Sequence, residues 1–544
     1  MNLEQATGQK LMFCFAGAEP SPEILAAIRR QHLGGVTLFR AWNVVNPAQV
    51  RGLTAALQEA ARLSGQPPLL IGADQEGGQL VAIDAGTTLF PGNMALAATR
   101  SDDLTYRVGR AIGLELAAMG VNVDYAPVCD INSDPRNPAV GVRSFGEDPR
   151  LVARLAAAMV RGLQAGGGAA TAKHFPGLGD TAIDSHYGTP ILRHDRERLN
   201  RVELPPFVAA IEAGARLIMA GHGAYPAFDG GLVAPATLSA PLLRGILRRS
   251  LRFEGAIISD SMAMGAIGAG QDLIVDAIAA LAAGVDLLLL GDYVDDQQRH
   301  VYAGVLQAAR RALLDPADIV ASAERVLDLK RWVGTLSQPS LDIVGCREHG
   351  ALATEIARRS VTLVRDRANL LPLALSVDSR LAVIVPRSKD LTPADTSSYV
   401  SCVLADALRR YHPRVDEFVV DHIPSDADIA AVRQRVGAYD IAIVGTINAS
   451  TQPAQATLVD ALLQSGMSTV VIALRTPYDL QAFPEAPTYC CVRLQHLAEF
   501  HGGGRGGVVR LYPLPGTTAR IDPWHPCVGA IVIMTGLLPF PQLS

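Results

Sequence analysis

The sequence lacks the features that would place the protein in a disulfide-bonded, membrane-spanning or nucleic-acid-binding class. Its seven cysteines are scattered without paired or zinc-type spacing, which argues against a disulfide framework and indicates a reducing compartment. No apolar run reaches about 18 residues, and residues 1–10 contain no signal-type apolar core. The net charge of −5 comes without a basic block. We therefore expect a cytoplasmic protein with no nucleic-acid and no membrane partner.

The chain of 544 residues is too long for one core, so two to four domains are expected. In residues 1–335, short apolar runs alternate with amphipathic stretches, which predict helices that include Pro22–Gln31, Pro47–Ser64, Leu151–Gln164 and Leu199–Ala213. Eight strands with intervening helices predict a (β/α)8 TIM-type barrel. A doubly wound sheet is the alternative, but no GxGxxG follows the first strand. The eight runs that predict strands are Leu11–Phe15, Gly35–Phe39, Leu69–Ala73, Val121–Ala126, Ala169–His174, Leu217–Ala220, Gly255–Ile258 and Val285–Leu290.

A second domain is predicted after the barrel. Residues 336–355 form the expected linker, and residues 356–544 are expected to form a smaller C-terminal α/β sandwich with a mainly parallel sheet. Its predicted strands are Arg359–Arg365, Leu381–Val385, Asp440–Gly445 and Thr469–Leu474, with a helix at Leu458–Ser465.

Polar residues gather where the expected barrel strands end. Because TIM-type barrels carry their active sites at the C-terminal ends of the strands, these residues predict an active site. In the loop after the fifth strand, Asp184 stands close enough to His186 to change the proton affinity of the imidazole. Asp130 and Glu76 could instead bond only backbone groups. The strand-end groups are Asp74–Gly78, Asp130, Arg143–Pro149, Lys173–His174, His222 and Ser259–Met262.

Four motifs resemble glycoside hydrolase family 3, in particular its bacterial β-N-acetylglucosaminidase branch, which includes enzymes of peptidoglycan recycling. They are DQEGG at Asp74–Gly78, GVRSFGEDP at Gly141–Pro149, KHFPGLGDTAIDSH at Lys173–His186 and SDSM at Ser259–Met262. The resemblance covers residues 1–335, and the second domain is similar to the family's C-terminal sandwich more loosely. The Lys173–His186 motif is the most specific, because the β-glucosidase members lack the loop histidine.

The resemblance implies a retaining exo-β-N-acetylglucosaminidase (β-N-acetylhexosaminidase). Its substrates would be terminal non-reducing N-acetyl-β-hexosamine residues of muropeptides or chitooligosaccharides. Asp260 would be the nucleophile that forms a covalent glycosyl-enzyme, and His186, held by Asp184, would be the general acid and then the general base. No cofactor and no metal are implied, and we expect a monomer or weak oligomer. The residues implied to bind the sugar in the −1 subsite are Asp74, Arg143, Lys173 and His174.

Two positions depart from the family pattern. Ala82 stands where the family often has an arginine, so one substrate donor is missing or supplied from elsewhere, and the aglycone preference could differ. Leu178 stands where a histidine is common, which does not touch the implied roles.

Four alternative functions remain open. A phosphorylase could use the same Asp260 and His186 with phosphate in place of water, and another family 3 β-glycosidase could share the site. A metal-dependent barrel hydrolase could use His174, His186 and His222 with an aspartate, although these histidines lack the spacing of common metal sites. A non-catalytic sugar-binding protein is the last alternative.

The C-terminal tail has no helical period where the family's second domain should end in a helix and a strand. When Val492–Pro523 is back-translated with permissible codons and read one base later, it can give an alanine-rich helix, the residues LFG and a closing strand. We therefore hypothesise that residues from about 490 to 544 are translated in a shifted frame. A divergent tail is the alternative, and the coding DNA decides between them.

Overall fold

The computed structural model describes residues 1–267, 273–291, 295–400 and 402–492. The hypothesis of a shifted reading frame falls almost entirely on residues 493–544, which lie outside this range, so it stays a prediction. The chain divides into two compact units. The first comprises residues 1–353 with 392–395, and the second comprises residues 354–391 and the chain from residue 396 onward.

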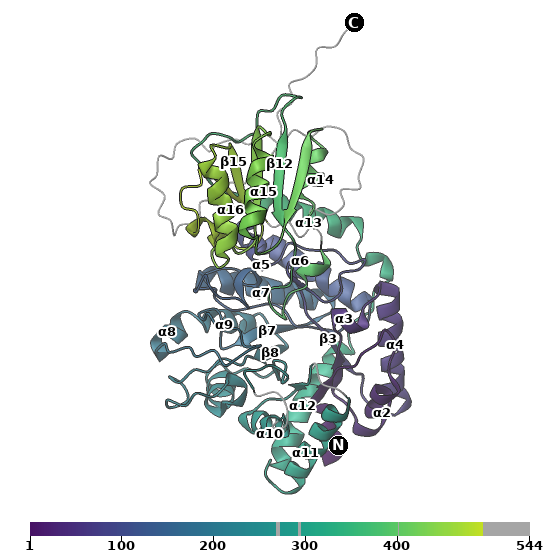
Figure 1. The fold of residues 1–544 in the computed structure, drawn as a ribbon. Helices are drawn as coiled ribbons and strands as arrows, with labels where there is room; N and C mark the ends of the chain where they lie inside the picture. The colour runs from purple at the N-terminus through teal and green to yellow at the C-terminus, as the bar shows by residue number, and fades with distance from the viewer. Residues whose placement is uncertain (268–272, 292–294, 401, 493–544) are drawn as a thin grey trace. The chain divides into compact units, whose positions relative to one another are not determined.

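Eight parallel strands form a barrel in the first unit (Figure 1). They follow the order β10-β1-β2-β3-β6-β7-β8-β9, and a parallel bridge between Ile258 and Leu287 joins the two ends of this sheet. Apolar side chains such as Met12, Leu70 and Ile258 are fully buried in the core. The strands are β1 (Leu11–Phe13), β2 (Gly35–Thr37), β3 (Leu70–Ala73), β6 (Val123–Asp124), β7 (Ala169–Phe175), β8 (Leu217–Ala220), β9 (Ala256–Ser259) and β10 (Leu288–Leu289).

Helices connect the barrel strands. Four of them begin with a capping side chain followed by proline, at Ser21–Pro22, Asn46–Pro47, Asp148–Pro149 and Asp315–Pro316. The cap accepts a free backbone N–H, and proline at the first helical position loses no hydrogen bond. The helices are α1 (Leu3–Gln9), α2 (Pro22–Gln31), α3 (Arg40–Asn43), α4 (Pro47–Leu63), α5 (Asn93–Thr99), α6 (Asp102–Ala118), α7 (Pro149–Gly166), α8 (Arg196–Arg201), α9 (Pro205–Glu212), α10 (Leu273–Ala283), α11 (Asp295–Arg310) and α12 (Pro316–Val333).

Shorter elements complete the first unit. A two-stranded hairpin follows β3 and carries the DQEGG residues. Its strands are β4 (Gln75–Gly77) and β5 (Leu80–Val81), and the short helices are η1 (Gly141–Arg143), η2 (Ala236–Leu238), η3 (Pro241–Ser250) and η4 (Leu341–Ile343).

The predicted barrel is confirmed, and one helix prediction is wrong. All eight predicted strands are present, with ends that differ by a few residues. The single helix predicted at Leu199–Ala213 is instead the pair α8 and α9. The reason is the proline pair at Pro205–Pro206, because proline lacks the N–H that a continuing helix needs. The chain therefore ends one helix and starts another with Pro205 in its first turn. Residues 336–355, the predicted linker, contain η4 and residues 347–355 of helix α13 (Arg347–Ser360).

The second unit contains a six-stranded sheet in the order β11-β16-β15-β14-β12-β13. Among the described strands of this unit, only the β11–β16 pair is antiparallel, as expected for a mainly parallel α/β sandwich. The strands are β11 (Thr362–Asp366), β12 (Leu381–Pro386), β13 (Val415–Val420), β14 (Ile441–Thr446), β15 (Thr469–Ala473) and β16 (Thr488–Cys491), and the helices are α14 (Leu404–Arg409), α15 (Asp426–Val436) and α16 (Pro453–Gln464), with η5 (Ser397–Tyr399) and η6 (Pro477–Gln481).

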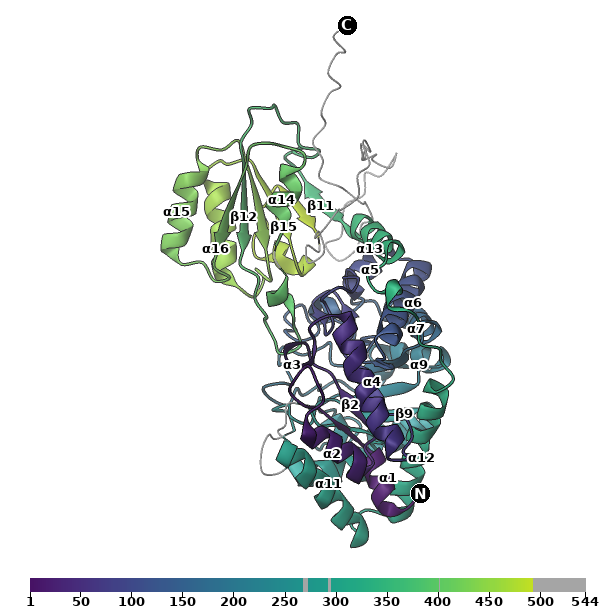
Figure 2. The same ribbon diagram turned by 90° about the vertical axis from the view of Figure 1, so that its right-hand side faces the viewer.

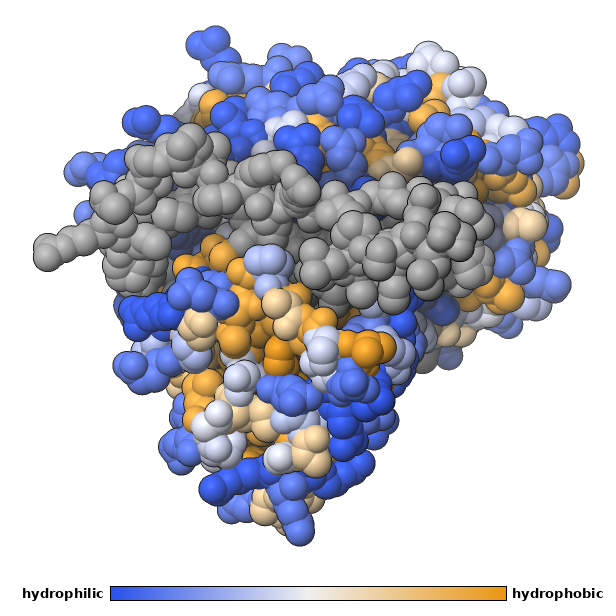
Figure 3. Space-filling model, turned by 90° about the horizontal axis from the view of Figure 1, so that it is seen from above, coloured by the Kyte–Doolittle hydropathy of each residue, from blue (hydrophilic) through white to orange (hydrophobic). Residues whose placement is uncertain are grey.

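Helices cover both faces of this sheet. Apolar residues of α15 and α16 share one buried cluster with the sheet, and α14 contributes to a second cluster on the opposite face (Figure 2). Figure 3 shows that hydrophilic residues cover much of the visible surface, with hydrophobic residues between them. No helix in the described part of the chain is long and apolar enough to cross a membrane.

Candidate active site

Polar side chains from the ends of five barrel strands meet at one end of the barrel. They follow or close β3, β6, β7, β8 and β9, whose parallel arrangement brings all the C-terminal ends to the same side. These residues are Asp74, Asp130, Lys173, His174, His222 and Asp260.

Glu76 lies at the centre of a buried ion network. Arg143 donates two hydrogen bonds to its carboxylate, at 2.9 Å from Nε and 2.7 Å from Nη2. Lys173 Nζ lies 2.6 Å from Glu76 and 2.5 Å from Asp74. Burial alone would raise the pKa of Glu76, but the charges of Arg143 and Lys173 lower it to about 2. The interpretation that Glu76 bonds only backbone groups is therefore wrong, since it holds the two cations in position.

Lys173 is almost fully buried, whereas the carboxylate of Asp74 is 28% exposed. Burial lowers the pKa of Lys173, but Asp74 and Glu76 together more than reverse this effect, so the pKa is raised. Lys173 therefore carries its positive charge inside the site. One of its three N–H donors remains after the bonds to the two carboxylates.

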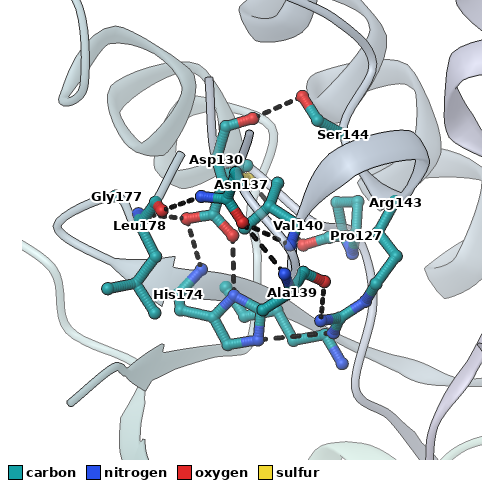
Figure 4. Close-up of polar contacts among 12 residues, drawn as sticks. Pro127, Asp130, Asn137, Ala139, Val140, Arg143, Ser144, His174, Gly177 and Leu178 are labelled. Atoms are coloured by element: carbon teal, nitrogen blue, oxygen red, sulfur yellow. Dashed lines mark hydrogen bonds and ion pairs between the residues drawn. The ribbon is translucent and has the colours of Figure 1, made fainter. Parts of the chain in front are cut away.

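His174 lies between Asp130 and Arg143 (Figure 4). Its Nδ1 is 2.7 Å from Oδ2 of Asp130, and its Nε2 is 3.5 Å from Nη2 of Arg143. The other Asp130 oxygen accepts hydrogen bonds from the backbone N–H groups of His174 and Leu178. Asp130 thus bonds backbone groups, and it also fixes the orientation of the His174 imidazole.

Asp184 and His186 form a second carboxylate–imidazole pair. Oδ1 of Asp184 accepts the backbone N–H of His186 at 2.9 Å and lies 2.6 Å from its Nδ1. The side chain of His186 is 21% exposed, while that of Asp184 is 4% exposed. Burial raises the pKa of Asp184, but His186 outweighs burial and the pKa is lowered. The carboxylate therefore stays ionised and supports a proton on the imidazole, whose Nε2 remains available for chemistry.

Backbone hydrogen bonds hold the loop of His186 against the segment that follows Asp260. Gly265 donates to the carbonyl of His186 at 3.0 Å, and Ala266 donates to that of Ser185 at 3.1 Å. A Cβ atom at Gly265 would lie 2.8 Å from the His186 carbonyl, so this approach requires glycine. The two proposed catalytic residues therefore belong to loops that are joined at the same end of the barrel.

Asp260 follows β9, and the charges of three imidazoles act on its carboxylate. Its Oδ1 accepts the backbone N–H of Ser261 at 2.7 Å. Burial raises the pKa of Asp260, but the nearby His174, His222 and His186 lower it below its ordinary value. Asp260 is therefore an ionised carboxylate at neutral pH, as a nucleophile must be.

His222 supports the turn that carries Asp260. Its Nδ1 lies 2.8 Å from Oγ1 of Thr237, and its Nε2 lies 2.9 Å from the carbonyl oxygen of Ser261. Both ring nitrogens of His222 are thus engaged, and burial lowers its pKa.

Within the described ranges, no group of three or more histidine, cysteine or acidic side chains is arranged to hold a metal. The metal-dependent alternative has no ligand set in this part of the chain.

The structure brings together all seven residues that the sequence singled out, and it adds Glu76 and Asp130 as the partners that orient Arg143, Lys173 and His174. Ala82 is buried, and its N–H donates to the carbonyl of Asp74, so this position offers no donor side chain. Both partners stood in the sequence at strand ends, but only the fold shows which groups they contact.

Comparison with known proteins gives matches to the barrel and to most of the chain. Residues 3–329 match the model of the glycosyl hydrolase family 3 N-terminal domain. The chain is 32% identical over 538 residues to "Beta-hexosaminidase A" of Pseudoalteromonas piscicida, with 89% of each chain covered. It is 36% identical over 285 residues to a "Beta-hexosaminidase" of Pseudomonas aeruginosa, covering 52% of this chain and 81% of the relative. A family 3 β-N-acetylglucosaminidase from Paenibacillus sp. has a similar structure, with a TM-score of 0.84, 34% identity, and coverage of 91% of this chain and 94% of the other.

Proposed function

Since the chain belongs to glycoside hydrolase family 3, we propose that it is a retaining, exo-acting β-N-acetylglucosaminidase. It would release terminal non-reducing N-acetyl-β-hexosamine residues from muropeptide or chitooligosaccharide substrates. One observation carries the proposal: an ionised Asp260 lies at the same strand-end site as a carboxylate-supported His186, and backbone bonds join their loops. The printed names of three relatives, which are β-hexosaminidases and a β-N-acetylglucosaminidase, support this sugar.

The two residues divide a double displacement between them. Asp260 attacks the anomeric carbon and forms a covalent glycosyl-enzyme, while His186 Nε2 gives a proton to the departing glycosidic oxygen. His186 then takes a proton from water, which attacks the anomeric carbon and frees Asp260. Asp184 stabilises the charged form of the imidazole and orients it, so one group can serve as acid and as base.

The ion network supplies the −1 subsite. Asp74 is the most exposed member and can accept hydrogen bonds from sugar hydroxyls, while Lys173, which bonds it, is a donor beside it. Arg143 and His174 contact each other next to this pair and complete the proposed subsite. Glu76 and Asp130 keep these donors in place before the sugar binds. Preorganised donors lose little on binding and can stabilise charge that develops on the sugar. The cytoplasmic location and the monomeric or weakly oligomeric state stay predictions.

Comparison of chromogenic substrates tests this proposal. We expect the 4-nitrophenyl N-acetyl-β-glucosaminide to be hydrolysed with a higher kcat/KM than the β-glucoside and the β-xyloside. A preference for the glucoside or xyloside would assign another family 3 β-glycosidase instead. The same reaction in phosphate buffer, assayed for N-acetylglucosamine 1-phosphate, tests the phosphorylase alternative: free sugar supports the hydrolase, and the sugar phosphate contradicts it.

A further inference from the structure

Tyr187 is the most exposed large hydrophobic side chain in the described part of the chain, and it directly follows the proposed acid/base. The residue is 74% exposed. Its ring centroid lies 6.5 Å from that of the His186 imidazole, and the two ring planes are tilted by 57°. Single exposed apolar side chains are common on protein surfaces and need no explanation. The position of this one beside a proton donor, and the support of its backbone, are what single it out.

Two other tyrosines of the barrel show the ordinary arrangement of this side chain. Tyr125 and Tyr225 are fully buried. The hydroxyl of Tyr125 lies 2.7 Å from Oγ1 of Thr37, and the hydroxyl of Tyr225 donates to the carbonyl of Gly177. Tyr187, in contrast, leaves most of its surface to solvent, so packing within the barrel does not account for a large aromatic residue here.

The backbone of Tyr187 is held although its side chain is exposed. Its N–H donates to the carbonyl of Asp184 at 3.0 Å. Two residues further along, the hydroxyl of Thr189 donates to the carbonyl of Ala266 at 3.0 Å. A Cβ atom at Gly265 would lie 3.3 Å from the carbonyl carbon of Tyr187, so the segment that follows the proposed nucleophile packs directly against this backbone. The ring is therefore presented from a fixed position between the loops of the two proposed catalytic residues.

The proposed mechanism decides which part of the substrate meets this ring. His186 protonates the glycosidic oxygen, and that oxygen joins the sugar in the −1 subsite to the group that leaves. The leaving group therefore lies on the His186 side of the site, where the ring of Tyr187 stands beside the imidazole. A pyranose presents C–H groups on its faces, and the negatively polarised face of an aromatic ring attracts them. The chemistry of Tyr187 thus suits a sugar better than a charged or a small leaving group.

We propose that Tyr187 forms the stacking surface of the aglycone (+1) subsite and contacts the pyranose ring of the sugar that leaves. This inference rests on the proposed glycosidase function and deepens it, because it names the class of leaving group: a sugar, rather than an alkyl or peptide group. Tyrosine offers a large contact area with few rotatable bonds, so ordering it on binding costs little. Because the backbone is held before the substrate binds, the contact also positions the glycosidic oxygen against His186.

Two substrates that differ only in the leaving group test the proposal. N,N′-diacetylchitobiose releases a sugar and methyl N-acetyl-β-glucosaminide releases methanol, and both leaving groups are alcohols that need a proton from His186. In Tyr187→Ala, kcat/KM for the disaccharide should fall about fivefold, while the value for the methyl glycoside should change by less than about twofold. Tyr187→Phe keeps the aromatic ring and should retain most of the activity on the disaccharide. Ile183→Ala removes another exposed side chain from the same loop and should leave both substrates unaffected.

The pH–rate profile separates a contact with the leaving group from an effect through His186. Tyr187→Ala should keep the profile of the unchanged protein, because the imidazole and its carboxylate partner are untouched. The inference is overturned if this variant loses the same factor on both substrates, if it loses nothing on the disaccharide, or if Tyr187→Phe is as slow as Tyr187→Ala. A failure of the proposed function looks different: the unchanged protein would release N-acetylglucosamine from neither substrate, and the inference would fall with it.

Discussion

Two buried charge clusters lie at opposite ends of the same barrel. They differ in whether hydrogen-bonding groups beside them are exposed and available for a ligand. The upper cluster, at the C-terminal strand ends, contains Glu76, Arg143 and Lys173. The lower cluster, at the N-terminal ends of β1 and β10, is built around Asp286, which is fully buried. Asp286 pairs with Arg248 and Arg325 and accepts hydrogen bonds from Ser322 and the backbone of Ile257.

The upper cluster keeps a partly exposed carboxylate and imidazole for a ligand, whereas both oxygens of the central carboxylate in the lower one are occupied by Arg248, Arg325, Ser322 and the backbone of Ile257. Asp74 and His186 are partly exposed beside the upper cluster. In the lower cluster, Lys10 is buried and bonded to the carbonyl of Val285 at 3.1 Å and to Ser322. Ion pairing alone therefore does not mark a functional site. A charge network becomes a candidate site when a carboxylate or an imidazole in it is still partly exposed, as Asp74 and His186 are, and otherwise it ties elements together.

The largest expected effect comes from Asp260→Asn. The substitution keeps the shape of the side chain but removes the nucleophile, so kcat should fall on the order of 10⁴-fold or more. The melting temperature should change little, because Asp260 has no ion pair to a buried cation comparable with those of Asp286. Steady-state kinetics and thermal unfolding measure the two effects. Retained turnover, or a loss of activity that matches a loss of folded protein, would contradict the assignment of Asp260.

A somewhat smaller loss is expected for His186→Ala. Removal of a general acid and base should cost roughly 10²- to 10⁴-fold. The loss should be greater for a sugar leaving group than for a nitrophenol, which departs with little protonation. The pH–rate profile should also lose the limb that His186 sets. Ile183→Ala is the matched control, since Ile183 is 50% exposed on the same loop, and it should keep the profile. A profile that is unchanged in His186→Ala would rule out the proposed role.

The upper cluster could be predicted from the sequence, because its residues stand in compact motifs that directly follow apolar runs. Asp74 and Lys173 are separated by 99 positions, yet the apolar run before each residue predicts that it lies at the C-terminal end of a barrel strand. The contacts of Glu76 could not be predicted, because the motif does not show whether a carboxylate meets backbone or side chains. The single helix predicted at Leu199–Ala213 is wrong because the prolines at 205–206 interrupt an apolar period that continues across them.

The lower cluster was not recognised at all. Lys10 and the carbonyl of Val285 are 275 positions apart, and no motif joins them. A signal existed nonetheless, since a charged residue immediately precedes or opens a buried run at both Lys10 and Asp286. Charges at the N-terminal ends of barrel strands fit structural roles, but their partners, Arg248 and Arg325, come from helices whose packing the sequence pattern does not specify.

Asp286→Asn should have the opposite effects to those expected for Asp260→Asn: a loss of stability with kcat retained. Burial raises the pKa of Asp286, but Arg248, Lys10 and Arg325 outweigh it and the pKa is lowered, so the group is ionised. Removal of its charge leaves the largely buried Arg248 and the buried Lys10 without their anion, while solvent screens the more exposed Arg325, so the cost should be about 3 kcal/mol of unfolding free energy, the low end for a buried ion pair. The control Asp318→Asn breaks the exposed pair with Arg244 and should cost about 0–1 kcal/mol.

Urea unfolding followed by tryptophan fluorescence measures this difference, because Trp42 and Trp332 lie in the first unit. Below its unfolding transition, Asp286→Asn should retain the kcat of the starting protein. If Asp286→Asn and Asp318→Asn are equally stable, or if folded Asp286→Asn has lost kcat, the lower cluster is not a purely structural counterpart of the upper one.

The smallest effect sharpens the same distinction through pH. Lys330 is buried near the lower end, where it bonds Gln9 Oε1 at 2.6 Å, and burial lowers its pKa to about 7. Between this value and the ordinary pKa of lysine, the unfolded chain binds a proton that the folded chain does not, so stability should rise with pH by up to about 1.4 kcal/mol per pH unit. In Lys330→Met this contribution disappears, and the unfolding free energy should depend less on pH between 7 and 10. Unfolding in urea at pH 7 and pH 9 measures the slope, with Lys389→Met as the exposed-lysine control. If the unfolding free energy of Lys330→Met depends on pH as steeply as that of the starting protein, Lys330 is charged in the folded state. Burial at the lower end of the barrel would then not distinguish this end from the upper one.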